Sequence, residues 1–173
     1  FMKGDMTKLP KMKIKSFSKF LKFMQVLLKM SSLLSIKEPP ENDEATSVLL
    51  CKCYFYLLSS GISQLNKLGH PAIHDWALKS PDRCYQWEVV GHPECTAYIR
   101  IKAGKSRAGR GAYKRAKPFF NMKFDCPTSA LKILLGTGDM FQMTANQQLI
   151  MEGGPEFGVQ IGDYMMIVGD LAS

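Results

Sequence analysis

The sequence predicts an α+β domain, in which helices pack on an antiparallel sheet. Three observations predict it: apolar residues recur at helical spacing near the N-terminus, β-branched and aromatic residues follow in short runs, and helical spacing returns at the C-terminus. The chain has 173 residues, 46% hydrophobic and 22% charged, as in one ordinary globular domain. The composition excludes collagen-like, disordered and multi-span membrane proteins.

The first expected element is a basic amphipathic helix over residues 14–36. Its apolar residues follow helical spacing and lysines line the opposite side. Two prolines after Lys37 end it. We expect residues 1–40 to be a helical extension and residues 41–173 to be the folded domain.

A second helix is expected from Asn42 or Asp43, either of which can cap it, to about Leu68. Its predicted apolar face contains Phe55 and Ile62, which share one stripe at helical spacing. Gly69, followed by a His-Pro pair, supplies the stop.

Strands are expected in the middle of the chain. After a loop around 76–82, residues 85–90 and 95–102 are rich in aromatic and β-branched residues and predict a hairpin. The Gly- and Arg-rich stretch 104–111 predicts a turn and a short edge strand. Residues 118–124 alternate as a further strand.

The C-terminal part predicts a short helix, a strand and a long helix. Pro127 begins a helix that Gly136 closes, and residues 141–151 alternate as a strand. Residues 155–171 form the last helix, with one apolar stripe along it.

The net charge of +8 is concentrated in two segments. Residues 1–40 hold nine lysines against two acidic residues, and residues 100–123 hold nine basic residues and no acidic one. The rest of the chain is acidic. The sequence therefore predicts two basic patches on an otherwise acidic protein.

The N-terminal patch leaves two interpretations open. The helix either packs on the sheet with a wet lysine face, or lies on anionic lipid. No signal peptide or transmembrane span is expected, so we predict a cytoplasmic protein that could contact membranes peripherally. The lysines concerned are Lys15, Lys19, Lys22 and Lys29.

The second patch, residues 102–117, suggests nucleic acid or another protein as an alternative binding partner. Nucleic-acid binding would use Arg107, Arg110 and Arg115. Tyr113 is the segment's one aromatic residue, however, and stacking platforms for bases are otherwise missing. We therefore favour a hairpin that is solvated or faces a membrane over one that binds nucleic acid. In the solvated hairpin, the charges would protect an edge strand from pairing with other chains.

The sequence contains no catalytic motif of a hydrolase, metalloprotease, phosphate loop or dinucleotide-binding fold, so we expect no enzyme and no cofactor. Five cysteines with no CxxC pair favour reduced, buried thiols over disulfides. A metal-bound accessory subunit remains an alternative. Its candidate ligands are His70, His74, Cys84, His92 and Cys95, although their spacing matches no common zinc module.

Phe and Met are dense after residue 118. Met fills irregular apolar space, so the region is either a tight core or the wall of a cavity that closes around a hydrophobic ligand.

The C-terminal region resembles the sterol carrier protein type-two, or non-specific lipid-transfer, family. The resemblance covers about residues 80–173 and is carried by three consecutive pieces. They are KPFFNMKFDCPTSALKILLGTGD from Lys117, FQMTANQQLIMEGG from Phe141, and the helix from Pro155 to Leu171.

This resemblance implies a five-stranded, mainly antiparallel sheet covered on one face by helices. It also implies non-enzymatic carriage of a fatty acid, acyl-CoA or sterol-like lipid in an apolar tunnel partly walled by the last helix. The residues that it places around the ligand are Phe124, Leu131, Leu134, Leu135, Phe141, Phe157, Ile161, Met165 and Val168.

Overall fold

The computed structural model describes residues 17–40 and 42–172. The predicted α+β class is confirmed, with six helices and five strands in the described part of the chain. Their order is α1 (Phe17–Leu34), α2 (Glu44–Lys67), α3 (Pro71–Lys79), β1 (Arg83–Val89), β2 (His92–Lys102), β3 (Lys105–Arg110), β4 (Phe120–Phe124), α4 (Pro127–Leu134), α5 (Met140–Ala145), β5 (Leu149–Glu152) and α6 (Pro155–Ala172).

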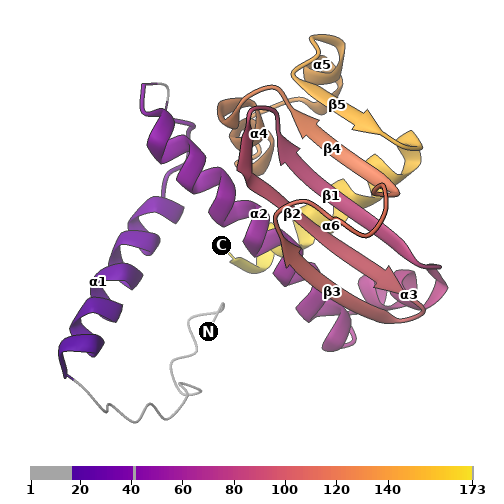
Figure 1. Ribbon diagram of the computed structural model, residues 1–173, viewed down its shortest axis with the longest axis horizontal. Helices are drawn as coiled ribbons and strands as arrows, with labels where there is room; N and C mark the ends of the chain where they lie inside the picture. Colours follow the sequence, from indigo (N-terminus) through magenta and orange to yellow (C-terminus); the bar gives the residue numbers. More distant parts are fainter. Residues whose placement is uncertain (1–16, 41, 173) are drawn as a thin grey trace.

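The five strands form one sheet in the order β3-β2-β1-β4-β5 (Figure 1). Three of its strand pairs are antiparallel, as the sequence predicts. The central pair, β1 with β4, is parallel, with Tyr85 opposite Phe120 and Val89 opposite Phe124. The sheet is therefore mixed, because the chain crosses from the β3 edge back to the far side of β1 before it forms β4.

Helices α2 and α6 lie behind the sheet in Figure 1, so one face, here called the helical face, is covered. Alternate residues of the strands point to it and are fully buried, as in Tyr85, Trp87 and Ile99. The opposite face, here called the open face, carries the crossover segment 111–119. Tyr113 of this segment packs on Tyr98 at 5.1 Å between ring centroids.

The second helix, α2, has the ends that the sequence predicts. The Asp43 side chain accepts a hydrogen bond from the Thr46 backbone N–H, and Gly69, at φ +75°, follows the helix. Its length and hydropathy alone would suit a membrane span. In this fold, however, Phe55 and Ile62 are fully buried in the core.

Two predicted segments are wrong. Part of the expected loop 76–82 belongs to α3, because Pro71 is the first residue of a new helix as well as a stop for α2. The first half of the expected strand 141–151 is α5, because the Asp139 side chain accepts hydrogen bonds from the Phe141 and Gln142 backbone N–H groups. The strand itself is shorter and begins at Leu149.

Helix α1 extends away from the sheet and its helices (Figure 1). Of its described side chains, Leu33 near the C-terminal end packs against the core, as does Ile36 just beyond the helix. Lys22 and Lys29 are exposed. Lys15 lies outside the described residues, as does the beginning of the helix expected from residue 14, and the Lys19 side chain is likewise outside the description.

Candidate functional site

A pocket of about 270 Å³ opens between α3, α6 and the beginning of β1, and is called here the α3–α6 pocket. Its rim is formed by exposed residues of α3, and its deeper wall by buried aromatic side chains. Polar and charged groups of α3 and β1 thus meet aromatic side chains in one open pocket. The lining residues are Ala72, Asp75, Trp76, Lys79, Ser80, Arg83, Phe157, Gln160 and Tyr164.

The aromatic wall joins three elements. Trp76 of α3 packs on Tyr85 of β1 at 5.3 Å and on Tyr164 of α6 at 4.8 Å between ring centroids. Phe119, just before β4, packs edge-on against Phe157 of α6 at 4.7 Å. These tilted and edge-on contacts are the favourable arrangements for aromatic pairs, so the wall is well packed.

Arg83 enters this wall from the first residue of β1. Its guanidinium carbon lies 4.2 Å from the centre of the Phe119 ring and 5.0 Å from that of Phe157. Among the described residues no carboxylate forms an ion pair with it, and Asp75 at the pocket rim pairs with Lys79 at 2.7 Å. The contacts of the Arg83 guanidinium are therefore with the Phe119 and Phe157 rings, and the Tyr85 hydroxyl is its polar neighbour.

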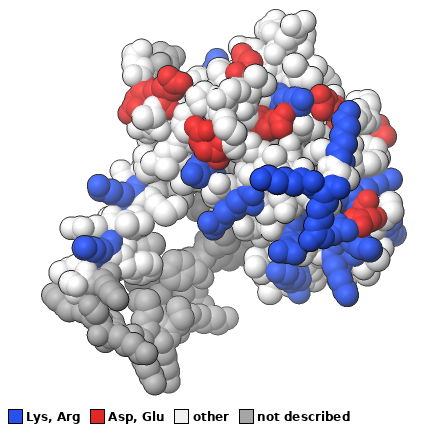
Figure 2. Space-filling view, in the orientation of Figure 1, with Lys and Arg blue, Asp and Glu red and all other residues white. Residues whose placement is uncertain are grey.

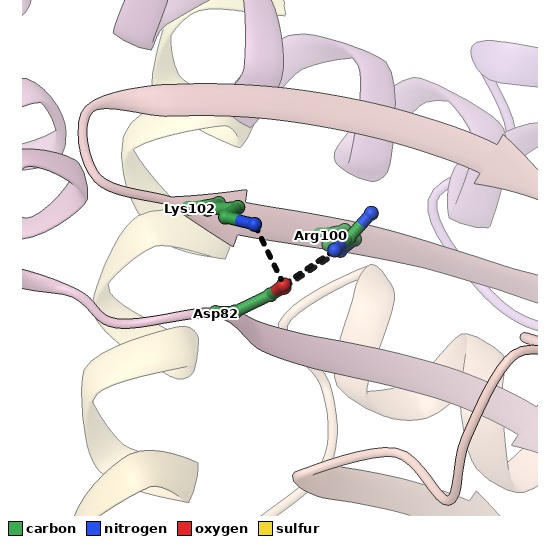
Figure 3. Close-up of polar contacts among 3 residues, drawn as sticks. All are labelled: Asp82, Arg100 and Lys102. Atoms are coloured by element: carbon green, nitrogen blue, oxygen red, sulfur yellow. Dashed lines mark hydrogen bonds and ion pairs between the residues drawn. The ribbon is translucent and has the colours of Figure 1, made fainter.

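The acidic neighbour Asp82 is engaged elsewhere. It lies on the open side of the sheet and binds Arg100 through both carboxylate oxygens, while Lys102 lies 3.5 Å away (Figure 3). The hydrogen bond from Arg100 and the positive charges nearby hold the pKa of Asp82 below its ordinary value of 3.8. Asp82 is therefore ionised and already neutralised.

Two buried polar atoms beside Arg83 make no hydrogen bond, namely the Trp76 Nε1 and the Tyr85 hydroxyl. Burial raises the pKa of Tyr85, even though Arg83, Trp76 and Ser80 lie near enough to favour its ionised form. Burial is also the main reason why the pKa of Tyr164 rises to about 12. Both phenols thus stay protonated near neutral pH.

The nine residues that the resemblance places around a ligand have different positions. Five are buried in the core, three are partly buried against it, and Phe141 on α5 is 85% exposed. Phe157 is the one that also lines the α3–α6 pocket. The five core residues are Phe124, Leu131, Ile161, Met165 and Val168, and the three at its edge are Leu134, Leu135 and Phe157.

Sequence reasoning missed Trp76, Arg83 and Tyr164. Arg83 carries a signal that could have been used, since it stands two residues before Tyr85, in step with the apolar side of β1. A cation in that register is unusual. Trp76 was hidden because its segment was expected to be a loop.

A larger opening of about 470 Å³ lies between α4, α5 and the segment before α2. Its lining is mostly polar, with Lys132, Asp139, Gln142 and Asn146 among its residues. The Asp139 carboxylate there already caps α5. Both openings have polar linings, and the α3–α6 pocket differs in lying against the buried side chains of Trp76 and Tyr164.

The structure separates the five alternative metal ligands. His74 Nδ1 lies 3.0 Å from the Asn66 side chain, and His92 lies beside Glu44 and Glu94. Cys95 donates to the Val48 carbonyl, while Cys84 belongs to β1 and His70 precedes α3. Within residues 17–40 and 42–172, no group of three or more His, Cys, Asp or Glu could hold an ion.

The predicted basic patch of residues 102–117 lies over β2, β3 and the crossover segment. Figure 2 shows lysines and arginines gathered there, in the orientation of Figure 1. Arg107, Arg110 and Arg115 are all exposed, and the Arg110 guanidinium also lies 5.0 Å from the centre of the Tyr56 ring of α2. Tyr113 is covered by its contact with Tyr98, which leaves the patch without a free stacking ring from this residue.

No protein-family model matches the sequence, and no curated protein matches it. Solved structures do resemble the fold. A protein described as "UbiJ-SCP2 ubiquinone synthesis protein" is 18% identical, with a TM-score of 0.39, over 68% of this chain and 96% of its own.

Two further structures are similar. A conserved hypothetical protein from Thermus thermophilus, described as possibly a sterol carrier protein, is 14% identical, with a TM-score of 0.42, over 68% of this chain and 87% of its own. A structure described as sterol carrier protein 2 is 12% identical, with a TM-score of 0.42, over 69% of this chain and 95% of its own.

Proposed function

We propose that the protein is a non-enzymatic carrier of one lipid-like molecule, such as a fatty acid, an acyl-CoA or a sterol-like lipid. The polar end of the ligand lies in the α3–α6 pocket, and its apolar part lies between α6 and the sheet. Burial of apolar surface, at about 25 cal/mol per Å², drives binding. The observation that carries the proposal is the position of Phe157, which lines the pocket and also packs on the core.

The interior beyond Phe157 is suited to making room. Met165 of α6 is buried there, and Met151 of β5 and Met140 of α5 pack against the same core. Methionine has three rotatable bonds and adapts to irregular shapes at low cost. These side chains can rearrange around an inserted chain more easily than branched ones could.

Helix α6 is itself suited to move. Gly162 lies in its interior, where glycine costs roughly 0.5–1 kcal/mol relative to alanine. A Cβ atom there would meet only Met140 Sδ, at 3.9 Å, so space does not require glycine. Helix α6, which covers the proposed ligand, is therefore less stable as a helix than it would be with alanine at position 162.

The test is ligand binding by delipidated protein, followed by native mass spectrometry and by displacement of a fluorescent fatty acid. Ala72→Trp places a large ring at the exposed rim of the pocket and is expected to abolish displacement. Ala45→Trp, on the exposed first turn of α2, is the matched control. Absence of binding by the unmodified protein at micromolar lipid would overturn the proposed function.

We further propose that α1 docks the carrier on anionic lipid. Apolar side chains of α1 are exposed, among them Phe23, Val26 and Leu28, the last at 66%. No acidic residue occurs between 17 and 34, so the helix carries only positive charge. A second copy of the same helix would meet this charge with its own, whereas an anionic surface complements it.

Co-sedimentation with phosphatidylserine-containing vesicles tests the docking. Leu28→Glu is expected to release the protein, and Leu68→Glu, at a residue 81% exposed just after α2, is expected to leave binding unchanged. Equal binding to neutral vesicles, or dimerisation through α1 with no vesicle binding, would contradict an anionic surface as the partner.

A further inference from the structure

The charge of Arg83 is unusual for its place in the sheet. In β1 it shares the helical side with Tyr85 and pairs with Ile101 of β2 in the antiparallel register. Arg83 is partly exposed, and among the described residues no carboxylate forms an ion pair with it. The neighbouring acid, Asp82, binds Arg100 and Lys102 on the opposite side of the sheet (Figure 3).

The rings of Phe119 and Phe157 orient the guanidinium but leave its hydrogen-bonding capacity free. A cation–π contact acts through the face of the cation, whereas the five N–H donors of arginine lie in its plane. These donors match the oxygens of a carboxylate or a phosphate in a two-pronged arrangement. Arg83 thus has the chemistry for an anion and lacks a protein anion among the described residues.

Two further groups beside it favour the same ligand chemistry. The indole nitrogen of Trp76 can only donate, and it is buried without an acceptor. The Tyr85 hydroxyl is protonated, buried and likewise unpaired. Buried polar groups are nearly always hydrogen-bonded, so the unpaired Nε1 of Trp76, a residue that lines the pocket, points to an acceptor supplied by a ligand.

The other charges around the pocket do not cancel Arg83. Asp75 lines the rim, and its carboxylate is neutralised by Lys79 at 2.7 Å. Asp163, next to Tyr164 on α6, is exposed to solvent. Of the three charged residues that line the pocket, Arg83 is the one without an oppositely charged partner among the described residues.

We propose that the α3–α6 pocket selects amphipathic ligands with an anionic head group, a carboxylate or a phosphate, which Arg83 binds directly. The inference rests on the proposed lipid-binding function, since it names the head group of the same ligand. It excludes neutral sterols and alcohols as the preferred cargo.

The experiment compares three probes with the same sixteen-carbon chain: hexadecanoate, hexadecyl phosphate and hexadecanol. Each displaces a fluorescent fatty acid from delipidated protein. We expect the unmodified protein to prefer at least one anionic probe over hexadecanol by about tenfold, as for a hydrogen bond to a charged group. The ratio of the two anionic probes tells a carboxylate site from a phosphate site.

Arg83→Gln is expected to remove that preference by weakening the anionic probes while hexadecanol is unaffected. Arg83→Lys keeps the charge but loses the fork, and is expected to restore the preference only in part. Lys67→Gln, at an exposed lysine in the last turn of α2, controls for net charge. Circular dichroism checks that each variant is folded.

The possible failures are distinguishable. Equal binding of all three probes by the unmodified protein would overturn head-group selection and leave the lipid carrier standing. An equal loss of all three in Arg83→Gln would show that Arg83 only supports the wall, which also overturns the inference. No binding of any probe would overturn the proposed function and the inference together.

Discussion

Arg83 and Arg100 lie on adjacent strands and point to opposite faces of the sheet, and their charges are compensated differently. On the open face, Arg100 binds Asp82 through two hydrogen bonds. On the helical face, Arg83 packs on the Phe119 and Phe157 rings and forms no ion pair with a carboxylate among the described residues.

A second lysine on the open face is also paired with carboxylates, as Arg100 is. Lys123 of β4 lies 2.9 Å from Glu152 and 3.4 Å from Glu88, so its charge is also compensated within the sheet. The difference teaches where to look for function. The charges on the open face are neutralised by neighbouring side chains, whereas Arg83 lacks such a neighbour and is the cation for which we propose a ligand.

The largest expected loss of stability comes from a substitution in the core on the helical face of the sheet. Phe124 is fully buried and packs on Phe55 of α2 at 6.0 Å between ring centroids. Phe124→Ala should lower the free energy of unfolding by about 3–5 kcal/mol, since it removes a large side chain and leaves a cavity. Urea unfolding measures the loss.

Tyr98→Ala is the matched variant on the open face, where a ring of similar size is only partly buried. This variant should lose clearly less free energy of unfolding than Phe124→Ala. Equal costs for the two variants would contradict the distinction between a packed and an open face.

A second prediction concerns the close approach of α6 to the sheet. A Cβ atom at Gly158 would lie 2.5 Å from Met151 Sδ and 3.3 Å from Phe120 Cζ. Gly158→Leu should therefore overpack the contact and destabilise the protein by about 1–3 kcal/mol. Thermal unfolding measures it, and an unchanged midpoint would mean that α6 does not press on the helical face.

Much of the fold could be predicted from the sequence because single segments carried strong local signals. Gly69 and Asp43 mark the ends of α2, and Pro127 marks the beginning of α4. The parallel pairing of β1 with β4 could not be predicted, since strand order depends on contacts between distant segments. Phe141 was misplaced because its alternation with Met143 imitates a strand, while Asp139 starts a helix.

The site could be predicted far less well. Periodicity identified buried residues such as Ile161 and Val168, but burial alone does not tell a core from a cavity wall. The α3–α6 pocket is made by Trp76, Arg83 and Tyr164, which come from three elements. Their meeting is a property of the tertiary fold, so no single stretch of sequence shows it.

A third prediction, with a smaller expected change in stability, tests whether glycine at position 162 of α6 helps a ligand to enter. Gly162→Ala should stabilise the protein by roughly 0.5–1 kcal/mol, because alanine favours the helix and its Cβ has room beside Met140. If α6 moves to admit a ligand, stopped-flow fluorescence should show slower lipid uptake in this variant. Faster or unchanged uptake with higher stability would separate α6 from ligand entry.

The smallest effect returns to the paired charge on the open face. Asp82→Asn removes the acceptor of Arg100, and because the pair is partly exposed the loss of stability at neutral pH should be slight. The hydrogen bond from Arg100 lowers the pKa of Asp82 below 3.8 in the folded protein. Its contribution to stability is therefore present above pH 3.8 and disappears as the pH falls through the lowered pKa.

Urea unfolding at several pH values measures this contribution. The free energies of unfolding of Asp82→Asn and of the unmodified protein should differ near neutral pH and converge in acid, while the preference for anionic probes stays unchanged. A difference that persists in acid would mean that Asp82 acts through something other than its charge, and a changed probe preference would mean that the two faces are coupled.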